Sequence, residues 1–169
     1  MIGNTRLVCV DGPAGSGKTT FAATMSRILS APVVHMDDVY EGWEHTLEQS
    51  TWDRVVDGIL KPLNEGKIAK PDIFDWHDQR FVAGPVIPAA RALIIEGVGS
   101  AHPSISMFAD DVIWVELTDE AHMERIIGRD GEAVRAPMAQ FLLMQSAYFA
   151  AFDIRAKANL RLVSSSGKV

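Results

Sequence analysis

Residues 11–20, DGPAGSGKTT, hold the strongest chemical signal in the sequence. They match the pattern G-x-x-x-x-G-K-S/T in full, through Gly12, Gly17, Lys18 and Thr19. Glycines let such a loop wrap tightly, so that several backbone N–H groups point into one concavity and can hold phosphate oxygens. Lys18 can reach the β- and γ-phosphates of a nucleotide, and the Thr19 hydroxyl can bind Mg²⁺. We therefore predict a site for ATP and Mg²⁺, with these nucleotide-binding residues: Gly12, Ala14, Gly15, Ser16, Gly17, Lys18, Thr19 and Thr20.

Three acids further along the chain could supply the rest of a phosphoryl-transfer site. Asp37 and Asp38 are adjacent in HMDDVYEGW, where they could be a catalytic pair, a metal ligand with its neighbour, or a polar strand end. Glu96 ends the apolar run LIIEG, and ligands gather at the carboxyl ends of parallel strands. An acid there, near the Thr19 hydroxyl, would hold Mg²⁺ or its water shell. Neighbouring side chains on extended backbone point to opposite faces, so we expect Asp37 and Asp38 to differ in role.

A pair of arginines follows in the segment TDEAHMERIIGRDGEAVR. Arg125 and Arg129 are four residues apart and would share one helix face. Phosphoryl transfer needs positive groups on the moving phosphate, and a lid helix can bring them in. We expect a small helical lid over about residues 119–137, in which both arginines are catalytic. The alternative is a solvated helix face with Glu124 and Asp130 as local partners.

Strands and helices of an alternating series would have to position these residues. The apolar runs are rich in β-branched residues and continuous rather than alternating, which indicates a parallel sheet covered on both faces. We expect strands at 6–10, 32–36, 91–97, 111–117 and 159–163, and helices at about 17–29, 51–64, 119–129 and 137–157. This alternation is typical of a doubly wound α/β fold, here with a five-stranded sheet flanked by helices. The length favours a single domain over residues 1–169, with an acceptor-side excursion at about 38–90.

Composition narrows the class of protein further. The 16 basic residues against 22 acidic ones give a net charge of −6, so no basic excess is available for a nucleic-acid backbone. No apolar stretch approaches the roughly 20 residues of a membrane span, and no leader-like segment stands at the N-terminus. The single cysteine, Cys9, excludes an internal disulfide framework. We expect a cytoplasmic protein that binds neither nucleic acid nor membrane; the chain could form a homo-oligomer.

The order of the motifs resembles the uridine kinase family of P-loop nucleoside kinases. The resemblance runs over about residues 6 to 163 and rests on DGPAGSGKTT, DDVY, PDIFDWHDQR, LIIEG and RIIGRD. It implies a P-loop NTPase fold and an ATP-dependent, Mg²⁺-requiring transfer of a phosphoryl group to a hydroxyl of a small, nucleoside-like metabolite. The first and fourth motifs are widespread among P-loop kinases, so the third, PDIFDWHDQR, is the more diagnostic.

The resemblance also implies roles for single residues. Asp37 matches the catalytic base, and Asp38 would cap the turn or support metal-bound water. Glu96 matches the metal-side acid, which acts beside Thr19, and the lid arginines are Arg125 and Arg129. The substrate segment would contain Asp37, Tyr40, Phe74, Asp75, Trp76 and Arg80, with Phe74 at the position of a base-contacting tyrosine.

Two residues near the second helix could replace a sugar-binding acid of the family that has no clean counterpart in this chain. These are Glu44 and Glu48. The aromatic residues of the same region could stack on a flat ring or pack in the core, and core packing is favoured for Trp52. His35, within a strand run, is interpreted as structural.

Other functions are compatible with the phosphate loop. The first alternative is a different P-loop kinase, which acts on another metabolite or on a nucleotide. A phosphorylated acceptor would need extra basic residues near 40–80, and that region contains only Arg54, Lys61, Lys67, Lys70 and Arg80. That scarcity mildly favours an uncharged acceptor. A nucleotide-binding regulatory module without transfer activity is the other, and the intact set Lys18, Thr19, Asp37 and Glu96 argues against it.

Overall fold

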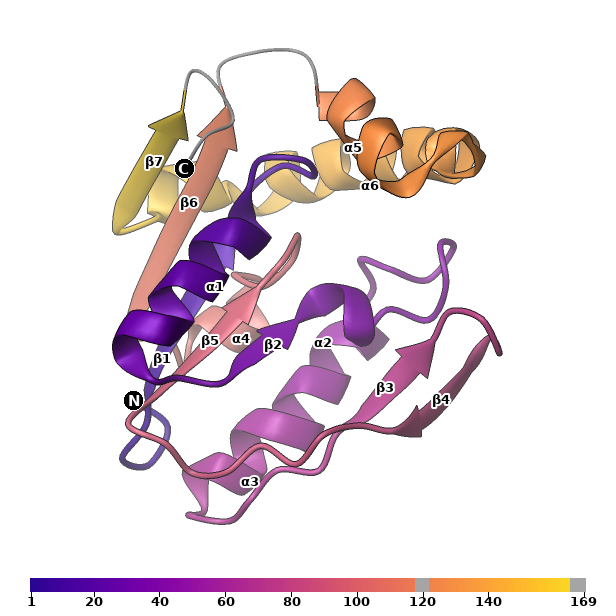
Figure 1. The fold of residues 1–169 in the computed structure, drawn as a ribbon. Coiled ribbons are helices and arrows are strands. Elements are labelled where there is room, and N and C mark those ends of the chain that lie inside the picture. The colour runs from indigo at the N-terminus through magenta and orange to yellow at the C-terminus, as the bar shows by residue number, and fades with distance from the viewer. Residues whose placement is uncertain (118–121, 165–169) are drawn as a thin grey trace.

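The computed structural model describes residues 1–117 and 122–164 of the chain. In this part of the protein five strands form one sheet, in the order β2-β5-β1-β6-β7 (Figure 1). Every neighbouring pair in it is parallel, as the continuous apolar runs predicted. The strands are β1 (Arg6–Asp11), β2 (Val33–His35), β5 (Ala92–Glu96), β6 (Asp111–Leu117) and β7 (Leu160–Ser164).

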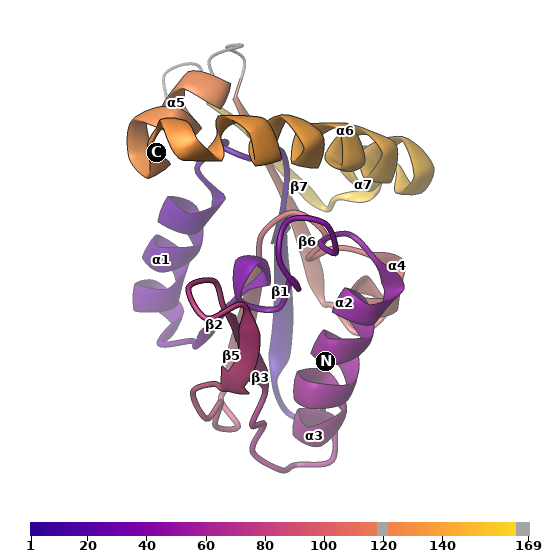
Figure 2. The ribbon, with the colours of Figure 1, turned by 90° about the vertical axis from the view of Figure 1, so that its right-hand side faces the viewer.

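Helices cover both faces of this sheet. In Figure 2, α1 (Lys18–Leu29) lies on one side of the strands, and α2 (Gln49–Val55), α3 (Lys61–Asn64) and α4 (Pro103–Ser106) lie on the other. A π-helical turn, η2 (Val56–Leu60), joins α2 to α3, so the helix expected at 51–64 is one helical segment with a local irregularity. The fold is therefore the doubly wound α/β arrangement predicted from the sequence.

The two longest C-terminal helices lie at the carboxyl ends of the strands, as Figure 1 shows. They are α5 (His122–Asp130) and α6 (Arg135–Phe152), joined through a short 3₁₀ turn, η3 (Glu132–Val134). The helix predicted at 119–129 is described from His122 onward. The helix predicted at 137–157 ends early, because Asp153 takes a φ of 49° and separates α6 from α7 (Ile154–Lys157).

Alternate residues of β1 serve the two faces of the sheet. Leu7 and Cys9 belong to the core cluster shared with α2, α4 and α6. Val8 and Val10 belong to a second cluster that packs against α1 through Ala22. A strand buried on both sides has no polar face, which explains why its sequence reads as a continuous apolar run.

The Pro- and Gly-rich excursion contains a β-hairpin that the sequence analysis did not predict. Its strands are β3 (Asp72–Asp75) and β4 (Arg80–Ala83), which pair antiparallel with Asp75 opposite Arg80. The Asp75 carboxylate accepts hydrogen bonds from the backbone N–H groups of His77 and Asp78, at 2.9 and 3.0 Å, and so closes the turn.

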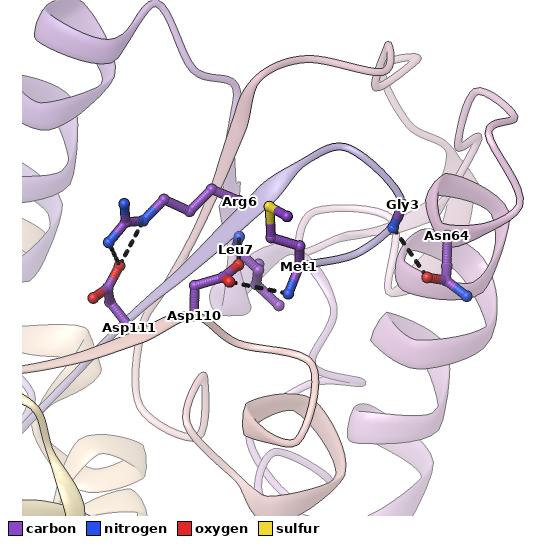
Figure 3. A network of polar contacts seen from close by, with 7 residues as sticks. All are labelled: Met1, Gly3, Arg6, Leu7, Asn64, Asp110 and Asp111. Atoms are coloured by element: carbon purple, nitrogen blue, oxygen red, sulfur yellow. Dashed lines mark hydrogen bonds and ion pairs between the residues drawn. The ribbon is translucent and has the colours of Figure 1, made fainter.

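A polar network ties the start of β1 to its neighbours at the end of the sheet away from the P-loop (Figure 3). Asp110 accepts hydrogen bonds from the Met1 amino group at 3.0 Å and from the Leu7 N–H at 2.9 Å. Arg6 donates to Asp111 at 2.8 Å, and the Gly3 N–H donates to the side chain of Asn64 at 3.0 Å. These contacts hold the first strand in register and take no part in the pocket described below.

Among the described residues, no helix combines the length and apolar character that crossing a membrane requires.

A buried histidine gives the fold a pH-dependent stability. His102 stacks on Trp52 with ring centroids 3.5 Å apart, and its Nδ1 accepts a 3.2 Å hydrogen bond from the Ser104 N–H at the start of α4. Burial lowers the pKa of His102 from 6.5 to about 4. Between these two pH values His102 is protonated in the unfolded chain but neutral in the native fold, so the free energy of unfolding falls as the pH decreases.

We therefore expect His102 to make the protein less stable at pH 5 than at pH 7. Urea unfolding of the wild type and of His102→Asn, at both pH values, measures this effect. The asparagine keeps a helix-capping acceptor and does not titrate, so its loss of stability between pH 7 and pH 5 should be smaller. An equal loss in both proteins would show that His102 is not responsible.

Candidate active site

The P-loop follows β1 and leads into α1, the context that the sequence predicted. Gly12 leaves no room for a side chain, because a Cβ there would lie 2.0 Å from the carbonyl oxygen of Val115. Gly17 precedes α1 with a φ of 92°, in the left-handed region that favours glycine. The loop can therefore lie close to β6 and still turn sharply into the helix.

Lys18 begins α1 as a buried cation. Its Nζ donates a 2.8 Å hydrogen bond to the carbonyl oxygen of Pro13. Burial lowers the pKa of Lys18, while the negative charges of Glu96, Asp11 and Asp37 act in the opposite direction. Nearby carboxylates, rather than bulk water, thus stabilise the positive charge of Lys18.

Asp11, at the end of β1, fixes the start of the P-loop through hydrogen bonds, a role that was not predicted from the sequence. Its fully buried carboxylate accepts hydrogen bonds from the N–H groups of Gly12 at 2.7 Å, Gly99 at 3.3 Å and Ala101 at 3.0 Å. The Tyr148 hydroxyl adds a fourth at 3.2 Å. Burial raises the pKa of Asp11 to about 6, although the backbone hydrogen bonds oppose this. One acid therefore joins the end of β1, the loop after β5, and α6.

Gln145 of α6 also fixes the P-loop, through a hydrogen bond to its backbone. Its Oε1 accepts a 2.7 Å hydrogen bond from the Ala14 N–H, and its side chain is buried. The residue lies in a helix stripe that otherwise consists of apolar and aromatic side chains, among them Phe141 and Tyr148. A single amide among apolar side chains could have indicated this contact from the sequence, because a buried amide group needs a hydrogen-bond partner.

Glu96 lies at the carboxyl end of β5, where the sequence placed it. Its Oε1 accepts a 3.1 Å hydrogen bond from the Thr19 hydroxyl and lies 2.6 Å from Nδ1 of His35. The hydrogen bond to Glu96 raises the pKa of His35. His35, interpreted from the sequence as structural, therefore contacts the predicted metal-side acid directly.

These residues suit a magnesium ion that is shared with a nucleotide. The hydroxyl of Thr19 and the carboxylate of Glu96 are oxygen donors, the type that Mg²⁺ prefers, and they already lie within hydrogen-bonding distance. In the described part of the chain no group of three or more His, Cys, Asp or Glu residues could hold a metal ion by itself. Magnesium bound through few side chains usually takes its other ligands from phosphates and water.

Asp37 and Asp38 lie on a 3₁₀ turn, η1 (Met36–Asp38), because β2 already ends at His35. The expectation that extended backbone points them to opposite faces is therefore wrong. They differ all the same: Asp37 lines the pocket, whereas Asp38 is not part of its wall. Burial of the Asp37 carboxylate raises its pKa, and the negative charge of Glu96 raises it further.

A pocket of about 570 Å³ connects the P-loop to these acids. The predicted nucleotide-binding residues from Ala14 to Thr20 line it without a gap, whereas Gly12 lies outside its wall. Asp37 and Glu96 face the same space. The volume falls in the range of small-molecule sites, about 300–1,000 Å³.

The predicted lid arginines line the pocket from α5. Arg125 and Arg129 both contribute to its wall, as does Asp130. Arg129 donates to both carboxylate oxygens of Asp130, at 2.6 and 2.7 Å, and this interaction raises the pKa of Arg129. The structure thus places both arginines at the pocket and gives Arg129 a local acidic partner, while their catalytic role stays a prediction.

Four aromatic side chains form another part of the pocket wall: Tyr40, Trp43, Trp76 and Phe141. The Tyr40 hydroxyl donates a 2.6 Å hydrogen bond to the carbonyl oxygen of Val98, and Trp76 Nε1 donates to that of Asp37 at 3.1 Å. Tyr40 and Trp76 were predicted substrate residues. Trp43 belongs to the aromatic region that could stack on a flat ring, whereas Phe141 was not assigned to the site.

The other predicted substrate residues lie outside the pocket wall. Phe74 is buried and packs edge-on against Trp76 and Phe81, at 5.5 and 5.3 Å between ring centroids. Asp75 closes the hairpin turn, and Arg80 is paired with Asp78 at 3.3 Å. A direct role for these three residues in acceptor binding stays a prediction. Trp52 lies in the core, as expected.

Sheet order, P-loop and pocket define a P-loop protein with the architecture of the small-molecule kinases. A solved structure described as a possible uridine kinase from Bacillus stearothermophilus superposes with a TM-score of 0.68 and 19% identity, covering 96% of this chain and 90% of that chain. A proposed fructose transport system kinase from a Silicibacter species superposes with a TM-score of 0.61 and 23% identity, covering 94% and 89%.

This chain therefore has the fold of the P-loop kinases, and its resemblance to uridine kinase-like proteins is confirmed at the level of the fold. No protein-family model matches the sequence, and a search of curated proteins finds no match. A shared fold at these identities does not identify a substrate, so the acceptor has to be argued from the site.

Proposed function

We propose that the protein is an ATP-dependent kinase that phosphorylates a hydroxyl group of a small, uncharged metabolite, with a nucleoside-like compound as the first class to test. One observation carries this proposal. The P-loop cation Lys18, the acid Asp37, the Thr19–Glu96 pair and two arginines all line a single pocket. Phosphoryl transfer needs a phosphate cradle, a group that receives the acceptor proton, and positive charge on the moving group.

Asp37 acts on the acceptor in the proposed reaction. Its carboxylate accepts the proton of the acceptor hydroxyl while the hydroxyl oxygen forms a bond to the γ-phosphorus of ATP. The bond from that phosphorus to the bridging oxygen of ADP breaks, and the electron pair leaves with ADP. The raised pKa of Asp37 supports this role, because a more basic carboxylate takes a proton more readily.

The remaining residues position ATP and stabilise charge. Lys18 and the P-loop N–H groups hold the phosphates, while Arg125 and Arg129 stabilise the charge on the transferred group. Thr19 and Glu96 would hold Mg²⁺, which when bound supplies positive charge to the phosphates and helps to orient them. Positioning and electrostatics are therefore expected to provide most of the rate enhancement.

A coupled assay of ADP release over a panel of nucleosides and sugars tests the proposal, with ATP binding measured in parallel. The proposal expects turnover that depends on both ATP and one class of acceptor. Tight ATP binding without acceptor-stimulated turnover across the panel would overturn it in favour of a nucleotide-binding module.

A further inference from the structure

The aromatic part of the pocket wall offers ring surface rather than hydrogen-bonding groups. Trp43 makes edge contacts with Trp76 and Phe141, at 5.3 and 6.4 Å between centroids, and Phe141 lies 6.1 Å from Tyr40. The hydroxyl of Tyr40 and the indole N–H of Trp76 already bond backbone carbonyls. A ligand on this wall therefore contacts mainly flat apolar surface, which favours a ring in the ligand.

The positive charges that line the pocket come from the P-loop and from α5. They are Lys18, Arg125 and Arg129, which the proposed mechanism assigns to the phosphates. Within the residues described, no lysine or arginine of α2, α3 or the β3–β4 hairpin lines the pocket. An acceptor that already carried a phosphate would have no cation of its own on the aromatic side.

Hydrogen-bonding side chains are equally scarce beside the rings. Thr46 lines the pocket with a buried hydroxyl that has no hydrogen-bond partner among the described residues, so it could meet one hydroxyl group of a ligand. Asp37 is reserved for the reacting hydroxyl, and Asp130 is occupied by Arg129 through both carboxylate oxygens. No asparagine or glutamine side chain lines the pocket in the described ranges 1–117 and 122–164.

The two acids that could have bound a sugar lie outside the pocket. Glu48 pairs with His45 at 3.1 Å on the exposed surface, and Glu44 is exposed as well. Neither contributes to the pocket wall. A vicinal diol placed against the rings would lose water from two hydroxyl groups and meet at most the Thr46 hydroxyl, so at least one group would stay unsatisfied, a loss of about 1–3 kcal/mol.

We propose that the acceptor is an uncharged aromatic or heteroaromatic ring that carries its reacting hydroxyl on a short arm, and that the enzyme does not recognise a sugar diol. The ring lies against Trp43, Trp76 and Phe141, and the arm reaches Asp37. This inference rests on the proposed kinase function and narrows its substrate class. A nucleoside would bind through its base and its hydroxymethyl group alone.

Matched acceptors test this directly in the wild-type protein by ADP release. Nucleosides are compared with their 2′,3′-dideoxy analogues, which keep the ring and the hydroxymethyl arm, and with hydroxymethylpyridines and hexoses. We expect each dideoxy analogue to retain kcat/KM within about threefold of its parent where the parent reacts, and hexoses to stay at background, because only ring and arm are recognised.

Other outcomes separate the inference from the kinase function. A drop of about tenfold or more on removal of the diol, or turnover with hexoses only, would overturn the inference and leave the kinase function standing. ATP binding without turnover for any compound would instead overturn the kinase function. Turnover of hydroxymethylpyridines alone would support the inference, since these compounds have no diol.

Variants of Trp43 provide a second measurement. Trp43→Leu should raise the KM for a ring-bearing acceptor about tenfold, as expected for the loss of one stacking contact, while the KM for ATP stays within about twofold. Trp43→Phe should restore most of the acceptor KM. Phe81→Leu removes an aromatic ring from strand β4, outside the pocket wall, so it is the control and should change neither value.

A purely structural role for Trp43 predicts a different pattern. Loss of packing alone would lower the unfolding temperature of Trp43→Leu without a selective change in acceptor KM. That result, with equal KM values in the leucine and phenylalanine variants, would contradict ring recognition by this residue.

Discussion

Asp37→Asn is expected to lower kcat by at least about 100-fold and to leave the KM for ATP nearly unchanged, because an amide cannot accept the acceptor proton. Asp37 lines the pocket, and its pKa is raised by the surrounding protein and by Glu96. Steady-state kinetics with ATP and the best acceptor of the panel measure both parameters.

The neighbouring acid provides the matched control. Asp38→Asn removes the same charge one residue along the same 3₁₀ turn, but the Asp38 side chain is not part of the pocket wall. We expect this variant to keep most of its activity. If Asp38→Asn instead abolished turnover while Asp37→Asn remained active, the assignment of the base would have to be reversed.

The pH profile distinguishes a proton acceptor from a merely polar contact. A carboxylate with a raised pKa becomes protonated as the pH falls through that value, and the protonated form cannot take the acceptor proton. The wild-type kcat should therefore fall toward acid pH. The residual activity of Asp37→Asn should lose this acid limb.

Lys18→Ala is expected to abolish measurable turnover, a loss of at least about 100-fold, because it removes the buried cation that we propose holds the transferred phosphate. The fold should survive, since Lys18 makes its side-chain hydrogen bond only within the loop, to the carbonyl oxygen of Pro13. ADP release and ATP binding, measured beside the thermal unfolding temperature, test both parts of this expectation.

Lys61→Ala is the control for charge removal as such. Lys61 is an exposed lysine that pairs with Asp57 at 2.5 Å and does not line the pocket. Its loss should leave turnover unchanged, because exposed ion pairs contribute little to stability. Turnover in Lys18→Ala at the wild-type rate would remove the P-loop from the mechanism.

Much of the fold could be predicted because its signals are local. The apolar runs at 6–10 and 91–97 indicated buried parallel strands, and both are present with at most one residue of difference at either end. The β3–β4 hairpin was missed because its turn depends on Asp75, whose carboxylate bonds two backbone N–H groups. The Pro and Gly residues of the surrounding segment indicated only that the chain leaves the sheet there.

Local residue patterns were enough to predict the P-loop, the parallel sheet and the acid at the end of β5. Each of these depends on residue types at short fixed spacings, such as Gly12 to Thr19, and backbone sterics and burial leave few alternatives. Such patterns also placed Glu96 beside Thr19, because the carboxyl ends of parallel strands meet at one edge of a sheet.

Which other residues reach this edge depends on how distant segments of the chain pack together. Gln145 bonds Ala14 across 131 residues of chain, and Tyr148 bonds Asp11 across 137. The pocket wall likewise draws Trp43, Trp76 and Phe141 from three separate segments. No local pattern specifies such meetings, because they follow from how α6 and the hairpin pack against the loop that the sequence did specify.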